Sequence, residues 1–161
     1  MRVKAYEMEL PGALEVVSLT AGTNGLIYGG TTGGREHLLF EYTPGTDAVR
    51  DLGSRIVPSN QLYTRNGDPI SQKIHHALDT LADGRIVGGT GQNVGYGSRH
   101  RKINEDDGGH VFIYDPATDT GRDLGVPVPH MWIITTTVSP DGGTLFGMTY
   151  FHNDFFAVDL Q

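Results

Sequence analysis

The sequence predicts an all-β protein made of three similar units, each a small antiparallel sheet of about four strands. Short apolar segments rich in β-branched and aromatic residues alternate with glycine-rich turns, and none keeps a helical period for long. In addition, a turn dipeptide recurs at spacings of 59 and 58 residues, as Asn24-Gly25, Asp83-Gly84 and Asp141-Gly142. Each turn joins an alternating segment to a short segment that ends in threonine, which is typical of a β-hairpin.

The first unit is predicted over about residues 14–53. Asn24-Gly25 separates its first two strands, and Pro44-Gly45 forms a turn after the third. The four strands are predicted at Val16–Ala21, Leu26–Thr31, Leu39–Pro44 and Arg50–Gly53.

The second unit, about 74–125, repeats this order, and the third, about 131–161, has three strands. The second unit's strands are predicted at His75–Thr80, Arg85–Thr90, Val111–Pro116 and Arg122–Gly125. Those of the third are predicted at Ile133–Val138, Leu145–Thr149 and Phe155–Leu160. A strand-like segment, 3–10, precedes the first unit. We expect it to complete the third unit of another copy, giving a head-to-tail homo-oligomer, most simply a six-unit dimer. The alternative is a fragment of a larger ring.

The segments Asp83–Thr90 and Val111–Thr118 resemble β-propellers of the kelch-like and quinoprotein-like kind. That resemblance implies that each unit is a four-stranded blade and that the whole chain is one propeller domain. In such a ring the first strand of each blade lines a central channel. The loops before the first strand and between the second and third strands open on one rim.

Composition narrows the functional classes. At 161 residues the chain fits a single domain, and its net charge of −7 argues against a nucleic-acid partner. There is no run of 18 apolar residues and no basic-then-apolar leader, so neither a membrane span nor a signal peptide is predicted. The chain has no cysteine, which excludes disulfides and thiolate metal sites and leaves its localisation open.

All seven histidines fall on the predicted rim described above. His75 and His76 open the second unit, where the other units have apolar pairs, and His130 precedes the third. His37, His100, His110 and His152 lie in or beside the connections between second and third strands. A channel-facing histidine would be a general base or a metal ligand, whereas the structural alternative is a buried imidazole bonded to a carbonyl. His110 and His152 are the candidate ligands for a divalent metal ion.

The second unit also carries two long insertions, 54–73 and 91–109. Both lie on the histidine rim and contain several basic residues and tyrosines, including Arg65, Lys73, Tyr96, Arg99 and Arg101. A cationic rim on an anionic chain predicts an anionic ligand. The alternative is a solvated loop whose acidic residues 105–107 neutralise its own basic residues. His130, Trp132 and Tyr150 are further candidates for contact with a sugar.

These residue types at a propeller rim resemble the sites of propeller-fold polysaccharide lyases, such as ulvan and oligogalacturonate lyases. The resemblance implies β-elimination of a uronic-acid polysaccharide. His75, His76 and Tyr96 would transfer protons, and Arg99 and Arg65 would neutralise the carboxylate. Lys73, Arg101, Trp132, His130 and Tyr150 would bind the substrate. The alternatives are a non-catalytic propeller that binds a sugar, a metal or a protein, and a fragment with a purely structural role.

Overall fold

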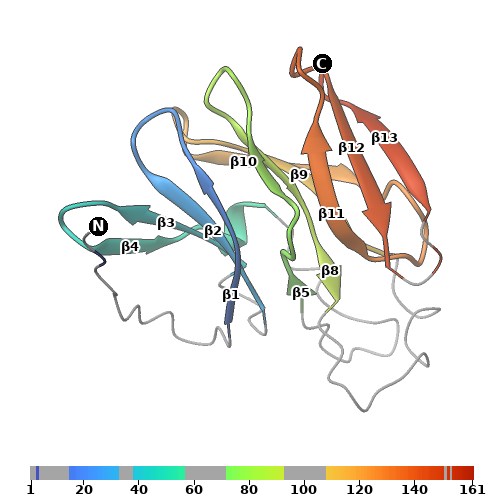
Figure 1. The fold of residues 1–161 in the computed structure, drawn as a ribbon, viewed down its shortest axis with the longest axis horizontal. Coiled ribbons are helices and arrows are strands. Elements are labelled where there is room, and N and C mark those ends of the chain that lie inside the picture. The colour runs from blue at the N-terminus through green and yellow to red at the C-terminus, as the bar shows by residue number, and fades with distance from the viewer. Residues whose placement is uncertain are drawn as a thin grey trace.

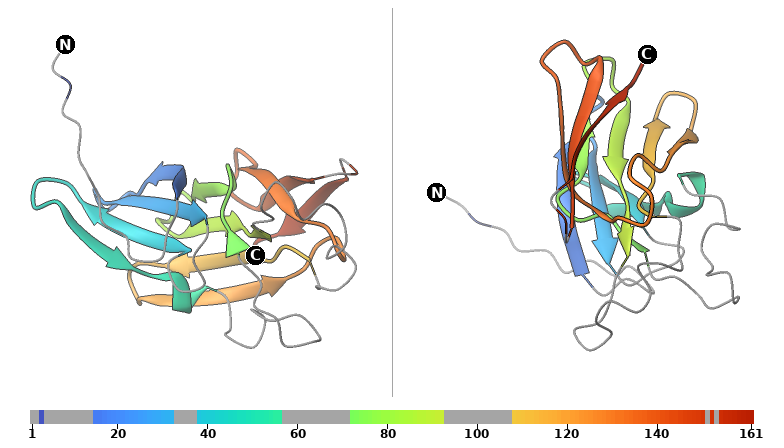
Figure 2. Two further views of the ribbon diagram at one scale, coloured as in Figure 1. Left: turned by 90° about the horizontal axis from the view of Figure 1, so that it is seen from below. Right: turned by 90° about the vertical axis from the view of Figure 1, so that its right-hand side faces the viewer.

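The structure is a computed structural model that describes residues 3, 15–32, 38–56, 72–92, 108–150, 152 and 154–161. Within these residues, thirteen strands form three antiparallel sheets, and the one helical element is a 3₁₀ turn at Gly53–Arg55. The prediction of an all-β fold is therefore confirmed. Figures 1 and 2 show the first and third sheets on opposite sides of the second. No helix in the described part of the chain is long and apolar enough to span a bilayer.

The first sheet is an antiparallel meander with two extra short strands. The meander contains β1 (Glu15–Ala21), β2 (Ile27–Thr32), β3 (Leu39–Thr43) and β4 (Ala48–Asp51). The extra strands are β5 (Gln72–Lys73) and β8 (Gly91–Gln92), which pair with each other while Lys73 pairs with Thr32 of β2. The sequence predicts that the insertions 54–73 and 91–109 have no secondary structure. In the structure, the end of the first insertion and the start of the second pair with each other and extend the first sheet.

The second and third sheets are also meanders, with four and three strands. The second contains β6 (Leu78–Thr80), β7 (Ile86–Gly89), β9 (Val111–Asp115) and β10 (Thr120–Gly125). The third contains β11 (Ile133–Val138), β12 (Thr144–Thr149) and β13 (Phe155–Asp159). The segment 3–10, predicted to pair with another copy, lies outside the described residues except for Val3.

The three predicted hairpin turns have the same local geometry. In each, the side-chain oxygen of Asn24, Asp83 or Asp141 accepts a hydrogen bond from the backbone N–H two residues later, at 3.0–3.2 Å. The glycine that follows has a φ between 75° and 92°, a backbone conformation that residues with a side chain rarely adopt. These turns explain why an Asx-glycine dipeptide stands at each position.

Each sheet also contains a glycine directly opposite a phenylalanine. The pairs join the second and third strands of each meander: Gly29 with Phe40, Gly88 with Phe112 and Gly147 with Phe156. A Cβ placed on Gly88 would lie only 2.7 Å from Cζ of Phe112, and one on Gly29 or Gly147 would collide with the opposite ring. The phenylalanine therefore covers the bare glycine backbone, a cross-strand arrangement that fixes the register.

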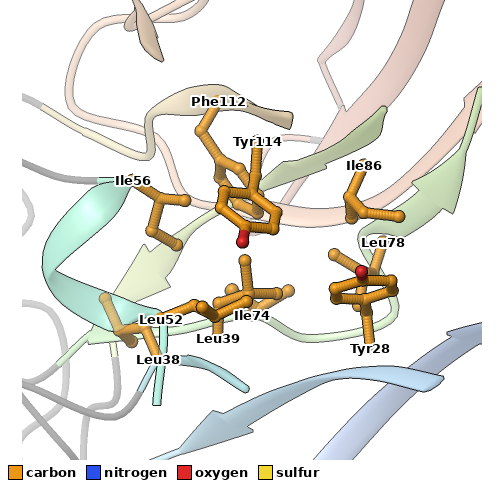
Figure 3. Close-up of a cluster of buried hydrophobic side chains, with 10 residues drawn as sticks. All are labelled: Tyr28, Leu38, Leu39, Leu52, Ile56, Ile74, Leu78, Ile86, Phe112 and Tyr114. Atoms are coloured by element: carbon orange, nitrogen blue, oxygen red, sulfur yellow. The ribbon is translucent and has the colours of Figure 1, made fainter. Parts of the chain in front are cut away.

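Two apolar clusters hold the three sheets together. The first cluster joins the first and second sheets, and Figure 3 shows Tyr28 and Leu39 facing Ile86 and Tyr114. The rings of Tyr28 and Tyr114 lie 6.1 Å apart at an angle of 57°. The second cluster joins the second and third sheets through side chains such as Val87, Ile113, Ile133 and Phe156. Because it contributes to both clusters, the second sheet is covered on both faces.

The histidine pair does not lie in a strand, contrary to the predicted strand His75–Thr80. Strand β6 begins at Leu78, and His76 has a φ of 51°, which interrupts the extended backbone. The residue equivalent to Ile133 is Ile74. Each of these isoleucines packs over a glycine of the preceding sheet and donates its N–H to a threonine carbonyl of that sheet. The apolar position is thus kept by Ile74, and the histidines follow it.

Candidate functional site

The structure describes part of the predicted site. His37, Arg65, Tyr96, Arg99, His100 and Arg101 lie outside the described residues, so their predicted roles stay predictions. The described candidates are Lys73, His75, His76, His110, His130, Trp132, Tyr150 and His152.

Five of the described candidates form one connected group, which we call the rim cluster: Lys73, His75, His76, Trp132 and Tyr150. The rings of His75 and His76 meet edge to face, with centroids 4.3 Å apart. The rings of Trp132 and Tyr150 are stacked, with centroids 6.4 Å apart and an angle of 10°. The segment before β6 therefore supplies the two imidazoles. Trp132, directly before β11, and Tyr150, directly after β12, supply the two aromatic rings.

Gly91 of β8 connects the two halves of the rim cluster. A Cβ placed on Gly91 would lie 3.4 Å from Cβ of Trp132 and 3.8 Å from Cε of Lys73. Lys73 is paired with Gly91 in the β5–β8 ladder. The short ladder that the sequence did not reveal is therefore the element that places the lysine beside the tryptophan.

The two aromatic residues differ in exposure, and this assigns them different roles. Trp132 is 3% exposed, so it is a core side chain and cannot offer an open face to a sugar. Tyr150 is 47% exposed and lies on top of the tryptophan ring. The surface available for stacking on a ligand is consequently that of Tyr150.

Two side chains of the rim cluster, His75 and Lys73, have pKa values shifted in favour of the neutral form. Burial is the main cause that lowers the pKa of His75, and the nearby charges of Lys73 and His76 lower it further. Burial likewise lowers the pKa of Lys73. The carboxylate of Glu15 acts in the opposite direction on both groups. A histidine that is neutral at neutral pH can accept a proton, which is the property a general base needs.

His75 also belongs to a polar seam between strands β6 and β11. Its ring has a hydrogen bond to the backbone of Ile134, and its Nδ1 has no hydrogen-bond partner within the described residues. The carbonyl of His76 accepts hydrogen bonds from the backbone N–H of Thr136 and the hydroxyl of Thr135, at 3.4 and 3.1 Å. Strand β11 thus holds His76, whose φ is positive, in place.

Two further polar atoms in this seam have no hydrogen-bond partner in the described part of the chain. They are Oδ2 of Asp79 and Oγ1 of Thr136. Asp79 lies opposite Val87, whose side chain is in the second apolar cluster, so its side chain faces the third sheet. Thr136 lies opposite Gly147, on the face covered by Phe156, so it points back toward the second sheet. Burial raises the pKa of Asp79.

The remaining histidines lie apart from any arrangement that could hold a metal within the described residues. His110 is buried, and its Nδ1 lies 3.0–3.1 Å from both carboxylate oxygens of Asp123. His130 has a φ of 63°, and His152 is exposed. No three His, Asp or Glu side chains gather as potential metal ligands in the described ranges. The assignment of His110 and His152 to a metal stays a prediction.

A second charged cluster was missed by sequence reasoning, and it lies between the first and second sheets. Arg50 donates to both carboxylate oxygens of Glu41, at 3.2 and 2.9 Å, and to Asp119 at 3.0 Å. Asp119 also accepts hydrogen bonds from Arg55 and from the hydroxyl of Tyr114. The hydrogen bond to Glu41 is the main cause that raises the pKa of Arg50. Because these charges satisfy one another, the cluster links two sheets rather than offering a binding site.

The comparisons with protein families and with curated proteins gave no match: no protein-family model matches the chain, and no curated protein matches its sequence.

Proposed function

We propose that the three sheets are blades of a β-propeller and that the rim cluster binds an anionic polysaccharide and catalyses its β-elimination. Support for the fold comes from the three meanders, which carry equivalent turns and equivalent glycine–phenylalanine pairs. Support for the activity comes chiefly from one observation. An imidazole whose pKa is lowered, His75, lies beside a cationic side chain, Lys73, and a second imidazole, His76.

The proposed reaction uses this grouping as follows. A uronate carboxylate binds Lys73, which stabilises the negative charge that develops when the neighbouring carbon loses its proton. Neutral His75 takes that proton from C5. The electron pair forms the C4–C5 double bond, the C4–O glycosidic bond breaks, and the leaving oxygen takes a proton from His76 or Tyr96. Tyr150 stacks against a sugar ring.

The test is the ultraviolet absorbance of the unsaturated product after incubation with uronate polymers. We expect His75→Gln to lower kcat by about a hundredfold or more, since general-base catalysis contributes that much. Lys73→Gln should raise KM and lower kcat/KM. Arg122→Gln is the control, because Arg122 is an exposed cation on β10. Absence of product with every uronate polymer tested would exclude the lyase activity.

A second candidate function is sugar binding without catalysis, and the exposed ring of Tyr150 favours it. Stacking of a tyrosine on a sugar needs no proton transfer. In this case calorimetry would detect binding of uronate oligomers without any change in absorbance. Tyr150→Ala would weaken that binding, whereas His75→Gln would leave it within about twofold of wild type.

A further inference from the structure

The outward face of the third sheet exposes a patch of large apolar side chains. Phe155 is 67% exposed and Met148 is 40% exposed, and these two residues are directly opposite each other on β13 and β12. Phe146 stacks on Phe155, with ring centroids 5.7 Å apart. Ala157, opposite Phe146, extends the patch. A patch of this kind on a sheet face usually marks an interaction surface.

The equivalent positions in the other two sheets form the contacts between sheets. Equivalence follows from the glycine–phenylalanine pairs, because the residue before each glycine and each phenylalanine points to the opposite face. In the first two sheets these residues are buried in the cluster shared with the next sheet: Tyr28 and Leu39, then Val87 and Val111. In the third sheet they are Phe146 and Phe155. The patch is therefore the surface on which a further sheet would pack.

The first sheet exposes the complementary surface on its far side. Leu19 lies opposite Gly29 as Leu78 lies opposite Gly88, yet Leu19 is 62% exposed while Leu78 is buried against the first sheet. Val16 lies opposite Thr31 as Ile133 lies opposite Thr149. Val16 is 41% exposed, whereas Ile133 is buried against the preceding sheet. Val16 and Leu19 thus form a surface suited to dock on a preceding sheet.

We propose that the patch of Phe146, Met148, Phe155 and Ala157 binds the β1 surface of Val16 and Leu19 on a second copy of this chain. The occupant is a second copy because both halves of the contact are present in each chain, and because the contacts between the sheets within the chain repeat the same geometry. The interface is heterologous, so copies join head to tail, and they form a ring when the rotation between copies closes. It does not depend on what the rim cluster binds.

The test is the solution mass of the chain at micromolar concentration by light scattering or sedimentation. We expect a mass of at least two chains. Phe155→Glu and Leu19→Glu each place a charge in the interface and should weaken association at least about tenfold. Ala117→Glu, in the exposed turn between β9 and β10, is the matched control and should keep the wild-type mass.

Mixing the two variants separates head-to-tail contact from other modes. In a mixed pair, the intact patch of the Leu19→Glu chain meets the intact β1 surface of the Phe155→Glu chain, so association should partly return. A circular-dichroism spectrum that keeps its strand signal shows that each variant is folded. A monomeric wild-type chain would overturn the proposal. So would loss of association in Phe155→Glu alone, since that result indicates two patches of the third sheet facing each other.

Discussion

The two interfaces between the sheets are both filled with apolar side chains, but they treat polar groups differently. Between the first and second sheets, Glu41, Arg50, Tyr114 and Asp119 satisfy one another through hydrogen bonds of 2.8–3.2 Å. Between the second and third sheets, polar atoms of three side chains in the β6–β11 seam have no hydrogen-bond partner in the described part of the chain: His75, Asp79 and Thr136.

The contrast is sharpest at one equivalent position. Glu41 lies opposite Tyr28, and in the second sheet the corresponding residue opposite Val87 is Ile113. The first interface thus contains a buried acid with its cation, where the second has an aliphatic side chain. Polar groups that satisfy one another stabilise an interface, whereas buried polar atoms without partners lower stability unless a ligand or water binds them. This difference is why we propose that the functional site lies at the second interface.

The largest expected loss of stability follows from removing a phenylalanine that covers a glycine. Phe112→Ala, in the first interface, and Phe156→Ala, in the second, should each lower the free energy of unfolding by about 3–5 kcal/mol. Each leaves a cavity and uncovers the opposite glycine. Urea denaturation gives the values, and Thr118→Ala, in an exposed turn, should change stability by less than about 0.5 kcal/mol. A loss below about 1 kcal/mol for both phenylalanines would contradict the packing described.

The next effect concerns the charge pair of the first interface. Arg50→Leu leaves the buried carboxylate of Glu41 without its cation, which should cost about 2 kcal/mol, less than for a fully buried pair because Arg50 is partly exposed. Glu41→Ile combined with Arg50→Leu makes this interface resemble the second one and should cost less than Arg50→Leu alone. A double variant that is less stable than Arg50→Leu would show that the pair itself stabilises the fold.

A smaller effect is expected at Asp79 in the second interface. Burial raises its pKa above the unfolded value, so its contribution to stability is present in acid and is lost as the pH rises through the folded pKa. Asp79→Asn should therefore raise the unfolding midpoint at pH about 7 and have little effect at pH about 3. The control is Asp159→Asn, which changes an exposed carboxylate on β13. Equal midpoints of Asp79→Asn and wild type across this range would show that Asp79 has a partner in solution.

The smallest effect is the titration of His75. Because the pKa of His75 is lowered, its contribution to stability depends on pH in the opposite direction to that of Asp79. The contribution is present above the unfolded pKa of about 6.5 and is lost as the pH falls through the folded value. His75→Gln should flatten the dependence of stability on pH between about 5 and 7. The measurement is the urea midpoint at several pH values. A slope that is unchanged by the substitution would place the imidazole in solvent.

The strands and turns that local chemistry determines can be predicted from the sequence. The Asx-glycine turns at Asn24, Asp83 and Asp141 need only neighbouring residues, so they were identified correctly. The β5–β8 ladder was missed because two-residue strands carry no periodicity. The predicted alignment of His75 with Ile133 is wrong by one residue, because the left-handed backbone at His76 accommodates an extra residue before β6.

For the site, the sequence identified the residue types but not their partners. Lys73, His75 and Tyr150 were predicted, and the structure places them in one group. Glu15 was not predicted, since it is the first residue of an ordinary strand and its charge acts on Lys73 from a distant segment of the chain. The bond between Arg50 and Asp119 spans 69 residues and has no local signature.

The coverage of the second sheet on both faces has a consequence for how the protein opens. Amide protons of β7 and β9 lie in ladders that are covered from both sides, so they should exchange with solvent only when the whole stack separates. The protons of β13, at the edge of the last sheet, should exchange through local fraying. Within one chain, the first and third sheets should therefore open before the second.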